Sequence, residues 1–337
     1  MDIMVCSPLI HQGQSLSLTL LYGLRKTAGF QKMDEKTIAS KIEELKKETN
    51  TILLVHNYQI PSIQDVADFL GDSLDLAKRA TLTDAENIIF CGVGFMAESA
   101  KILNPEKNVI IPDIDARCPM AAMVDPKELI KLKEKHPDAE VVSYINTTAE
   151  IKALSDICCT SANGVSVVKS LECDKVIFVP DQNLGSYVKR YVQDKEIIIW
   201  PGLCPTHHRI RKQQIINLKN RHPKAEILVH PECRPEVIDV ADHVFSTNGM
   251  VNYSKESKTT EFIIGTEKEL CYRLKKENPE KEFYSIKSAI CPNMKKITLE
   301  KVLNSFQTLG PKVTLPEDII HKARKPLERM MNIGRGD

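Results

Sequence analysis

The 337-residue chain lacks long apolar runs, a strong excess of one charge and any C-x-x-C pair of cysteines. No uninterrupted hydrophobic stretch approaches the roughly 18 residues of a membrane span, so the sequence predicts no transmembrane helix. The formal net charge of +1 provides no basic field for nucleic acid or for an anionic membrane surface. Local groups rather than the overall field must therefore hold any anionic substrate.

The first 32 residues are a poor signal peptide. Their apolar segment at 16–24 is followed, rather than preceded, by Arg25 and Lys26. A helix signature begins directly after Met33, with Asp34 as the cap. We therefore expect 1–32 to be a disordered extension, Met33 to be the natural start, and the protein to be cytoplasmic. In that compartment its ten cysteines are expected to be reduced thiols and metal ligands rather than disulfides.

One pattern recurs three times along the chain. Each copy ends in Cys-Pro, at Cys118, Cys204 and Cys291, which are 86 and 87 residues apart. Further markers keep nearly the same spacing: a strand-ending set (His56, Tyr144, His230), an aspartate set (Asp68, Asp156, Asp242) and a hydroxyl set (Ser73, Ser161, Thr247). This period is longer than that of solenoid repeats, and it favours three small α/β units.

Helices and strands are expected to alternate within each copy, which predicts parallel sheets with helical crossovers. The predicted fold class is α/β, with three similar αβα three-layer domains arranged as a pseudo-threefold triangle around a central site. The tail is expected to contain a helix near 298–308, a strand-like run at 312–316 and a helix near 317–331. The predicted domains are 33–123 (completed by the tail segment 297–337), 124–209 and 210–296.

Three thiolates can meet at one point if the three units face inward, because function collects beyond the carboxyl ends of parallel strands. None of the three has the C-x-x-C spacing of a zinc ribbon or a ferredoxin. Iron–sulfur cubanes usually take four thiolates, so three would leave one iron open, as in a catalytic site. A zinc site with three cysteine ligands and buried structural cysteines are the alternatives that the spacing leaves open.

The remaining markers supply anion-binding and acid–base groups. Ser73, Ser161 and Thr247 stand at expected helix starts, where hydroxyls and free amides bind carboxylate or phosphate, or simply cap the helix. Acid–base capacity comes from His56, Tyr58, Tyr144, His230 and Glu232. In CPTHH (204–208), His207 or His208 is expected to play at most a supporting role behind the cysteine ligand.

These motifs resemble the quinolinate synthase family of de novo NAD biosynthesis, and the resemblance spans about residues 34–330. The matching segments are HNYQIPSIQDVADFLGDSL (56–74), GFMAESAKILNP (94–105), ARCPMA (116–121), YINTTAE (144–150), CTSANG (159–164), CPTHH (204–208), VHPEC (229–233), STNGM (246–250) and AICPNMKK (289–296). The family fold is a triangle of three αβα domains around a [4Fe-4S] cluster held by three cysteines. The chain lacks the closely spaced cysteine triplet that some members carry around the third ligand, which argues against disulfide regulation here.

The resemblance implies a transferase-type condensation of iminosuccinate (iminoaspartate) with dihydroxyacetone phosphate, giving quinolinate, phosphate and water. The open iron would act as a Lewis acid. A transient contact with an iminoaspartate-producing enzyme is a further expectation, and nucleic acid and membrane are not expected partners. By the resemblance, the cluster ligands are Cys118, Cys204 and Cys291, and the substrate-binding residues are His56, Ser73, Tyr144, Asn146, Ser161, His230, Glu232 and Thr247. Tyr58 and Glu232 are the first choices for proton transfer, with Tyr144 and His230 as further catalytic candidates.

Two other classes compete with this reading. A non-catalytic iron–sulfur redox or oxygen sensor needs the thiolates but not a hydroxyl and amide lining from all three units. A zinc-dependent lyase or aldolase could use the same frame. Iron and sulfide analysis separates the zinc enzyme from the iron–sulfur readings.

Overall fold

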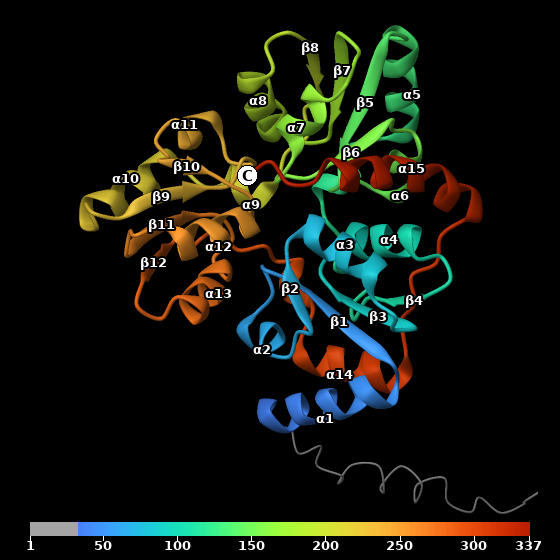
Figure 1. Cartoon of the computed structure of the whole chain (residues 1–337), viewed down its shortest axis with the longest axis vertical. Coiled ribbons are helices and arrows are strands. Elements are labelled where there is room, and N and C mark those ends of the chain that lie inside the picture. Colours follow the sequence, from blue (N-terminus) through green and yellow to red (C-terminus); the bar gives the residue numbers. More distant parts are fainter. Residues whose placement is uncertain (1–32) are drawn as a thin grey trace, which may run out of the picture. The chain divides into compact units, whose positions relative to one another are not determined.

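The computed structural model describes residues 33–337, so the expectation for 1–32 lies outside the described residues. The described chain forms three four-stranded, all-parallel sheets (Figure 1). The predicted α/β class with three similar αβα units is confirmed. Within residues 33–337 no helix combines the length and the apolar character needed to cross a bilayer.

The first sheet has the strand order β2-β1-β3-β4. Its strands are β1 (Thr51–His56), β2 (Phe69–Gly71), β3 (Asn87–Cys91) and β4 (Asn108–Ile110). Its helices are α1 (Glu35–Glu48), α2 (Pro61–Gln64), α3 (Ser73–Leu82) and α4 (Gly94–Leu103). All six residues of β1 are buried, as expected for a central strand with helices on both faces.

The second and third sheets repeat this order as β6-β5-β7-β8 and β10-β9-β11-β12. The second contains β5 (Ala139–Tyr144), β6 (Ile157–Cys159), β7 (Lys175–Val179) and β8 (Glu196–Ile199), with α5 (Pro126–Lys135), α6 (Ala149–Ala153), α7 (Gly164–Lys169), α8 (Gln182–Tyr191) and α9 (Pro205–His208). The third contains β9 (Glu226–Val229), β10 (His243–Val244), β11 (Glu261–Gly265) and β12 (Glu282–Ser285), with α10 (Lys212–Arg221), α11 (Pro235–Ile238), α12 (Thr247–Glu256) and α13 (Leu270–Glu277). We call each sheet with its helices a unit.

The recurring aspartates have one structural task in all three units. Asp68, Asp156 and Asp242 each accept a hydrogen bond from a backbone amide of the central strand, at 2.8, 2.7 and 2.8 Å. Each aspartate also donates its own backbone N–H to the carbonyl of the same strand residue. The carboxylate therefore fixes the loop that leads into the short second strand, and it contributes to the fold rather than to the site.

Sequence reasoning missed the short second strands β2, β6 and β10. They contain only two or three residues, too few to show the period-2 alternation that marks a strand. Parallel pairing with the central strand makes them strands, with Leu54 opposite Phe69 and Tyr144 opposite Cys159. Tertiary pairing rather than local pattern determines them.

The tail forms helices α14 (Leu299–Thr308) and α15 (Glu317–Ile333), close to the predicted ranges. Helix α14 packs on α1, and α15 lies against α4 of the first unit and α6 and β6 of the second (Figure 1). The strand expected at 312–316 is wrong: only one antiparallel bridge forms, between Ile110 and Lys312. Pro311 precedes this run and Pro316 ends it, and neither proline has an N–H to continue a ladder. The 33–123, 124–209 and 210–296 boundaries stay a prediction.

Candidate active site

One pocket lies between the three units, beyond the carboxyl ends of their central strands. It gathers every residue that the sequence singled out as a ligand, substrate or catalytic group. Those twelve lining residues are His56, Tyr58, Ser73, Cys118, Tyr144, Asn146, Ser161, Cys204, His230, Glu232, Thr247 and Cys291. The pocket also contains Asp72, Val93, Phe95, Met96, Thr160, Thr206, His207 and Met294. Residues as far apart along the chain as His56 and Met294 therefore share one chemical environment.

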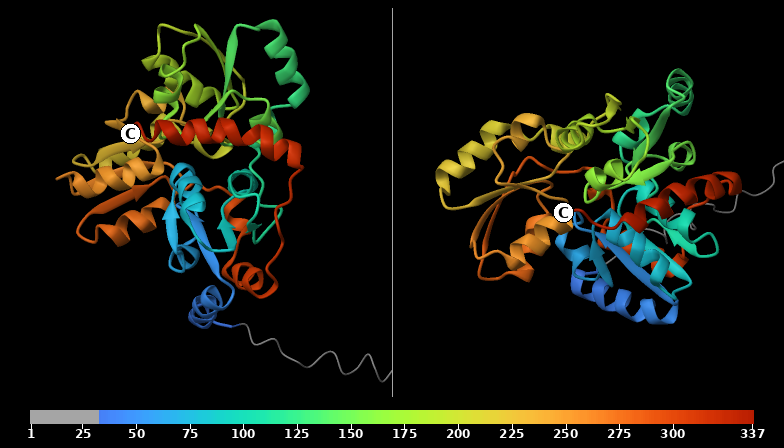
Figure 2. Two further views of the ribbon diagram at one scale, coloured as in Figure 1. Left: turned by 45° about the vertical axis from the view of Figure 1, so that its right-hand side comes forward. Right: turned by 45° about the horizontal axis from the view of Figure 1, so that its top comes forward.

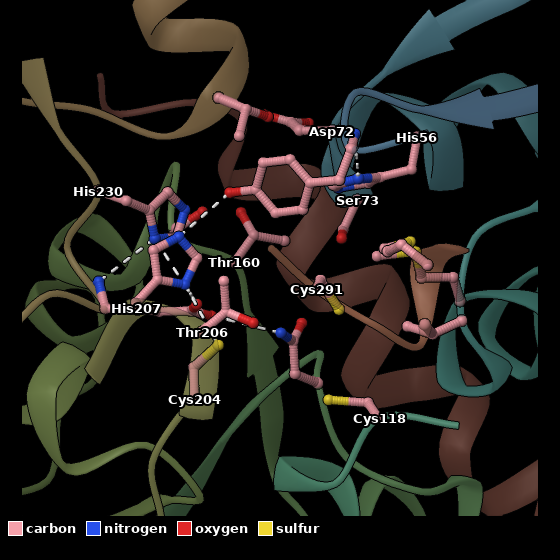
Figure 3. A pocket seen from close by; sticks show the side chains of 18 of the residues that line it. His56, Asp72, Ser73, Cys118, Thr160, Cys204, Thr206, His207, His230 and Cys291 are labelled. Carbon is pink, nitrogen blue, oxygen red and sulfur yellow. Dashed lines mark hydrogen bonds and ion pairs between the residues drawn. The ribbon is translucent and has the colours of Figure 1, made fainter. Parts of the chain in front are cut away.

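Each unit contributes one of the three pocket cysteines. Cys118 precedes the 3-10 turn Met120–Met123, Cys204 caps α9, and Cys291 precedes the 3-10 turn Met294–Lys296. Figure 3 shows the three sulfurs around one part of the pocket. The three cysteines therefore line the same pocket instead of separate surfaces.

Two buried carboxylates hold the cysteine loops. Asp181 accepts the backbone N–H of Cys204 at 2.9 Å, and Glu267 accepts that of Cys291 at 3.2 Å. Both side chains follow the third strand of their unit, and both are completely buried. Burial raises the pKa of Asp181, and the nearby Glu232 carboxylate raises it further. Their equivalent places, 86 residues apart, are a signal that sequence reasoning overlooked.

Glu232 is the centre of the polar network in the pocket. Its carboxylate lies 2.5 Å from Nδ1 of His207, and the Asn146 amide donates to it at 3.3 Å. Burial opposes ionisation of Glu232, but the adjacent His207 imidazole outweighs this and lowers the pKa of the carboxyl below its usual range. Glu232 is thus held as a buried carboxylate.

Tyr58 connects to this network through His207. Its hydroxyl lies 2.6 Å from the Thr266 hydroxyl and 3.3 Å from Nε2 of His207. Burial raises the pKa of Tyr58 well above its ordinary value, and the Glu232 charge adds to the shift. The phenol is therefore protonated at neutral pH, and a path Tyr58–His207–Glu232 runs along one wall of the pocket.

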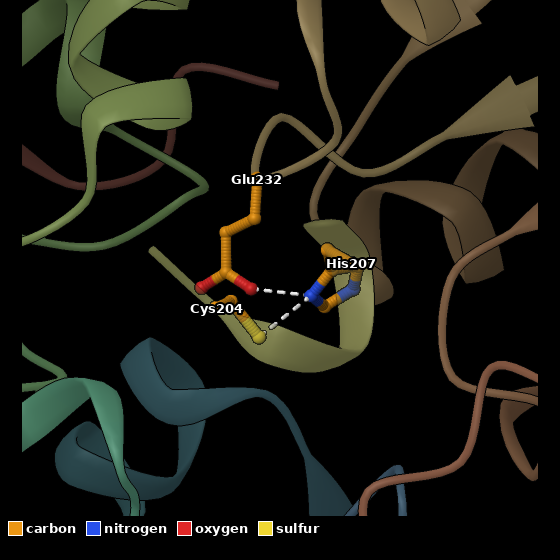
Figure 4. A group of neighbouring side chains, drawn as sticks. All are labelled: Cys204, His207 and Glu232. Atoms are coloured by element: carbon orange, nitrogen blue, oxygen red, sulfur yellow. Dashed lines mark hydrogen bonds and ion pairs between the residues drawn. The ribbon is translucent and has the colours of Figure 1, made fainter. Parts of the chain in front are cut away.

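His207 is more central than the sequence suggested. Besides its contacts with Glu232 and Tyr58, its Nδ1 lies 3.2 Å from the sulfur of Cys204 (Figure 4). Its ring also stacks on that of His230, with 4.5 Å between the ring centroids. In the described part of the chain, Cys204, His207 and Glu232 bring ligand atoms within 4.8 Å of one another, close enough to hold a metal ion. The CPTHH motif did not indicate that His207 would contact Glu232 and Cys204, because the turn of α9 decides which of the two histidines faces the pocket.

The two strand-end histidines are neutral. Burial lowers the pKa of His56 to about 4, and burial together with the neighbouring His207 lowers that of His230 to about 3. Each ring accepts a backbone N–H two residues further on, from Tyr58 and Glu232 respectively. That contact fixes the ring orientation and leaves the other ring nitrogen available.

We expect this burial to make the protein sensitive to acid. An unfolded histidine takes up its proton near pH 6.5 whereas folded His56 does so near 4, so the unfolded state binds more protons between these values. The free energy of unfolding should therefore fall as the pH drops through this window, by at most roughly 3 kcal/mol for His56. Denaturant unfolding at about pH 7 and about pH 5 should show a smaller loss in His56→Gln than in the wild type. The same loss in both proteins would contradict the assignment, and His321→Gln on the exposed face of α15 is the control.

The hydroxyl set lies at or near helix starts. Ser73 and Thr247 are the first residues of α3 and α12, whose caps are Asp72 and Ser246. Ser161 precedes α7 by three residues. Asp72 and Ser246 supply the side-chain caps, which leaves the hydroxyls of Ser73 and Thr247 to the pocket and, for Thr247, to the amide of Asn57 at 2.8 Å.

The fold and the site together define an α/β protein in which three similar units enclose one pocket lined by thiols, imidazoles and a buried carboxylate. The family described as "Quinolinate synthetase A protein" matches residues 40–332. The chain is 54% identical over 290 residues to the quinolinate synthase of Thermodesulfovibrio yellowstonii, an alignment that covers 86% of this chain and 96% of that protein. It is 53% identical to the quinolinate synthase of Dehalococcoides mccartyi and 49% to that of Caldicellulosiruptor saccharolyticus, each over 302 residues, 89% of this chain and 100% of the relative. The chain belongs to the quinolinate synthetase A protein family.

Proposed function

We propose that the chain is a quinolinate synthase that condenses iminosuccinate with dihydroxyacetone phosphate, forming quinolinate, phosphate and water for NAD biosynthesis. The observation that carries this proposal is the single pocket that unites one cysteine from each unit with a shared set of polar side chains. The proposal is supported by relatives that are named quinolinate synthase and align with 86% and 89% of this chain. The nine cysteines among residues 33–337 are free, as a reducing compartment would keep them, which supports a cytoplasmic location.

The donor set of the pocket fits a [4Fe-4S] cluster. Burial raises the pKa of Cys118 to about 12 and raises those of Cys204 and Cys291 above their ordinary value. Three such thiols lose their protons only when positive charge is placed among them, as metal ligands do. When bound, the cluster supplies an iron with an open position that acts as a Lewis acid. Cys118, Cys204 and Cys291 would hold it.

The side chains opposite the cysteines would bind and orient the two substrates. The Asn146 carbonyl oxygen is buried without a hydrogen-bond partner among the described residues, so it is available to a ligand donor. Nδ1 of His56 and of His230 accepts a backbone N–H, so Nε2 of each neutral ring carries the proton and offers a donor at the strand end. The hydroxyls of Ser73, Ser161 and Thr247 offer donors to carboxylate or phosphate oxygens. Each of these groups is held by its own strand end or helix start, which keeps the site preorganised.

Proton transfer would use the wall formed by Tyr58, His207 and Glu232. Tyr58 holds a proton at its hydroxyl, and Glu232 accepts one at its carboxylate, with the imidazole of His207 between them. The Tyr144 hydroxyl also interacts with Glu232, and burial raises its pKa well above the ordinary value. The wall therefore offers both a donor and an acceptor at neutral pH. A condensation that expels two waters needs both.

A zinc-dependent enzyme on the same frame is the second candidate, because Cys204, His207 and Glu232 lie close enough for one ion. Zinc bonds of about 2.0–2.3 Å limit the separation of two ligand atoms to roughly 4.6 Å. The cysteines of the other two units stand outside this close group among the described residues. Three thiols spread around a wider centre suit a multi-iron cluster better.

An anaerobic assay tests the proposal. The purified protein should form quinolinate from iminoaspartate and dihydroxyacetone phosphate, and it should contain iron and sulfide with visible absorption. Zinc without sulfide would favour the second candidate. A cluster-loaded protein that forms no quinolinate would favour an iron–sulfur sensor and overturn the proposed activity.

A further inference from the structure

The segment 334–337, which follows α15, ends between the three units (Figures 1 and 2). It contacts the residue that precedes the corresponding helix in every unit. In the first unit it reaches Asp72 before α3, in the second Asn163 before α7, and in the third Ser246 before α12. The residues beside these caps, Ser73 and Thr247, line the pocket. The segment thus contacts the back of the pocket wall, not its interior.

Arg335 makes the charged contacts of the segment. Its Nη1 donates to Asp72 at 3.0 Å and to Asp75 at 3.1 Å, and its Nη2 donates to the Ser246 hydroxyl at 2.7 Å. The Ser246 hydroxyl in turn donates to Asp72 at 3.2 Å. One guanidinium therefore joins the starts of α3 and α12 across two units. It also balances two carboxylates that burial leaves poorly solvated, since the side chains of Asp72 and Asp75 are 7% and 24% exposed.

The segment is packed into place. Gly334 has φ of +77°, which turns the chain out of α15 at little cost for glycine. Gly336 donates its N–H to the carbonyl of Ala162 at 2.8 Å, and a Cβ there would lie 2.5 Å from the Ser166 hydroxyl. Asp337 accepts the backbone N–H of Ser246 at 2.7 Å, and it also pairs with Arg335 at 3.0 Å. These contacts fix Arg335 at one place between the units.

The location of Asp72 and Asp75 has a consequence for anion binding. Asp72 lines the pocket beside Ser73, and Asp75 lies in the first turn of the same helix. A helix start with a free hydroxyl attracts phosphate, whereas two uncompensated carboxylates within the first turn repel it. Arg335 supplies the missing positive charge from outside the pocket, where it does not occupy space that a substrate needs.

We propose that Arg335 is a positioning residue for the phosphate-bearing substrate. It holds the starts of α3 and α12 at a fixed separation and neutralises Asp72 and Asp75, so that Ser73 and Thr247 present their hydroxyls to the phosphate. This inference rests on the proposed condensation with a triose phosphate. It assigns the phosphate to the side of the pocket formed by α3 and α12.

The test compares Arg335→Gln with the wild type under anaerobic conditions. We expect the KM for dihydroxyacetone phosphate to rise roughly tenfold to hundredfold, because charged hydrogen bonds are lost and two carboxylates are left unbalanced. The KM for iminoaspartate, the kcat and the visible absorption should change much less. Arg335→Lys should be intermediate, because lysine keeps the charge but not the bidentate geometry.

A charge-balanced double variant separates this role from a merely structural one. Asp75→Asn combined with Arg335→Gln restores the net charge. It should reverse part of the rise in the KM for dihydroxyacetone phosphate. Arg324→Gln is the matched control: Arg324 lies on α15, which precedes the segment, and pairs only with Glu328 among the described charged side chains. Inorganic phosphate should raise the Tm of the wild type but not of Arg335→Gln.

A wild type that forms no quinolinate overturns the proposed function. The rise in Tm with phosphate then still tests the role of Arg335. If the wild type is active and Arg335→Gln keeps both the wild-type KM for dihydroxyacetone phosphate and the phosphate-induced rise in Tm, this inference alone is overturned.

Discussion

Alanine at any one of Cys118, Cys204 and Cys291 is expected to remove both the bound iron and the formation of quinolinate. The three thiols come from three units and line one pocket, so no neighbouring cysteine replaces a lost one there. Changes outside the ligand set of a metal typically cost about 10- to 100-fold, and loss of a ligand should exceed that range. Iron, sulfide and visible absorption are measured on anaerobically prepared protein, together with the rate of quinolinate formation.

Cys173→Ala is the matched control for this series. Cys173 is a free, half-buried cysteine of the second unit that does not line the pocket. It should keep wild-type iron content and rate. Quinolinate formation at the wild-type rate in any of the three ligand variants would reject the shared site. If only Cys204→Ala loses iron and activity, the metal centre is instead the group formed by Cys204, His207 and Glu232.

The threefold repeat could be recognised in the sequence because the fold uses the same position for the same task in each unit. The aspartates at 68, 156 and 242 show this most directly, since all three accept an amide of the central strand. Strand-end residues such as His56 and His230 were likewise predictable. The carboxyl ends of parallel strands meet at one edge of each sheet, and the three edges face the same space.

What the sequence could not show depends on contacts between units. His207 and His208 are adjacent and of the same residue type, so the sequence does not distinguish them. Only the turn of α9 directs His207 to Glu232 of the third unit. Arg335 contacts Asp72 from 263 residues away, and no local pattern announces such a pair. The strands β2, β6 and β10 are likewise created by pairing rather than by propensity. Residue patterns within one unit could be predicted from the sequence, whereas contacts between distant segments could not.

Replacing Glu232 by glutamine is expected to reduce kcat by roughly 10²- to 10⁴-fold, the usual contribution of a general acid or base. The change keeps the size of the side chain but removes the charge that lies 2.5 Å from His207 and that Asn146 and Tyr144 also contact. The proton path from Tyr58 then ends at an amide that cannot accept a proton at neutral pH. Because no cysteine is altered, iron and sulfide should stay near their wild-type content.

Glu236→Gln is the control for this change, four residues along the chain. Glu236 pairs with Arg234 at 3.6 Å on the surface of α11 and does not line the pocket, so its replacement should leave kcat unchanged. Steady-state rates of quinolinate formation across a pH series give the decisive comparison. A kcat of Glu232→Gln within a few-fold of the wild type, with full iron content, would remove Glu232 from proton transfer. Loss of iron together with activity would instead make its carboxylate part of the metal site, next to Cys204.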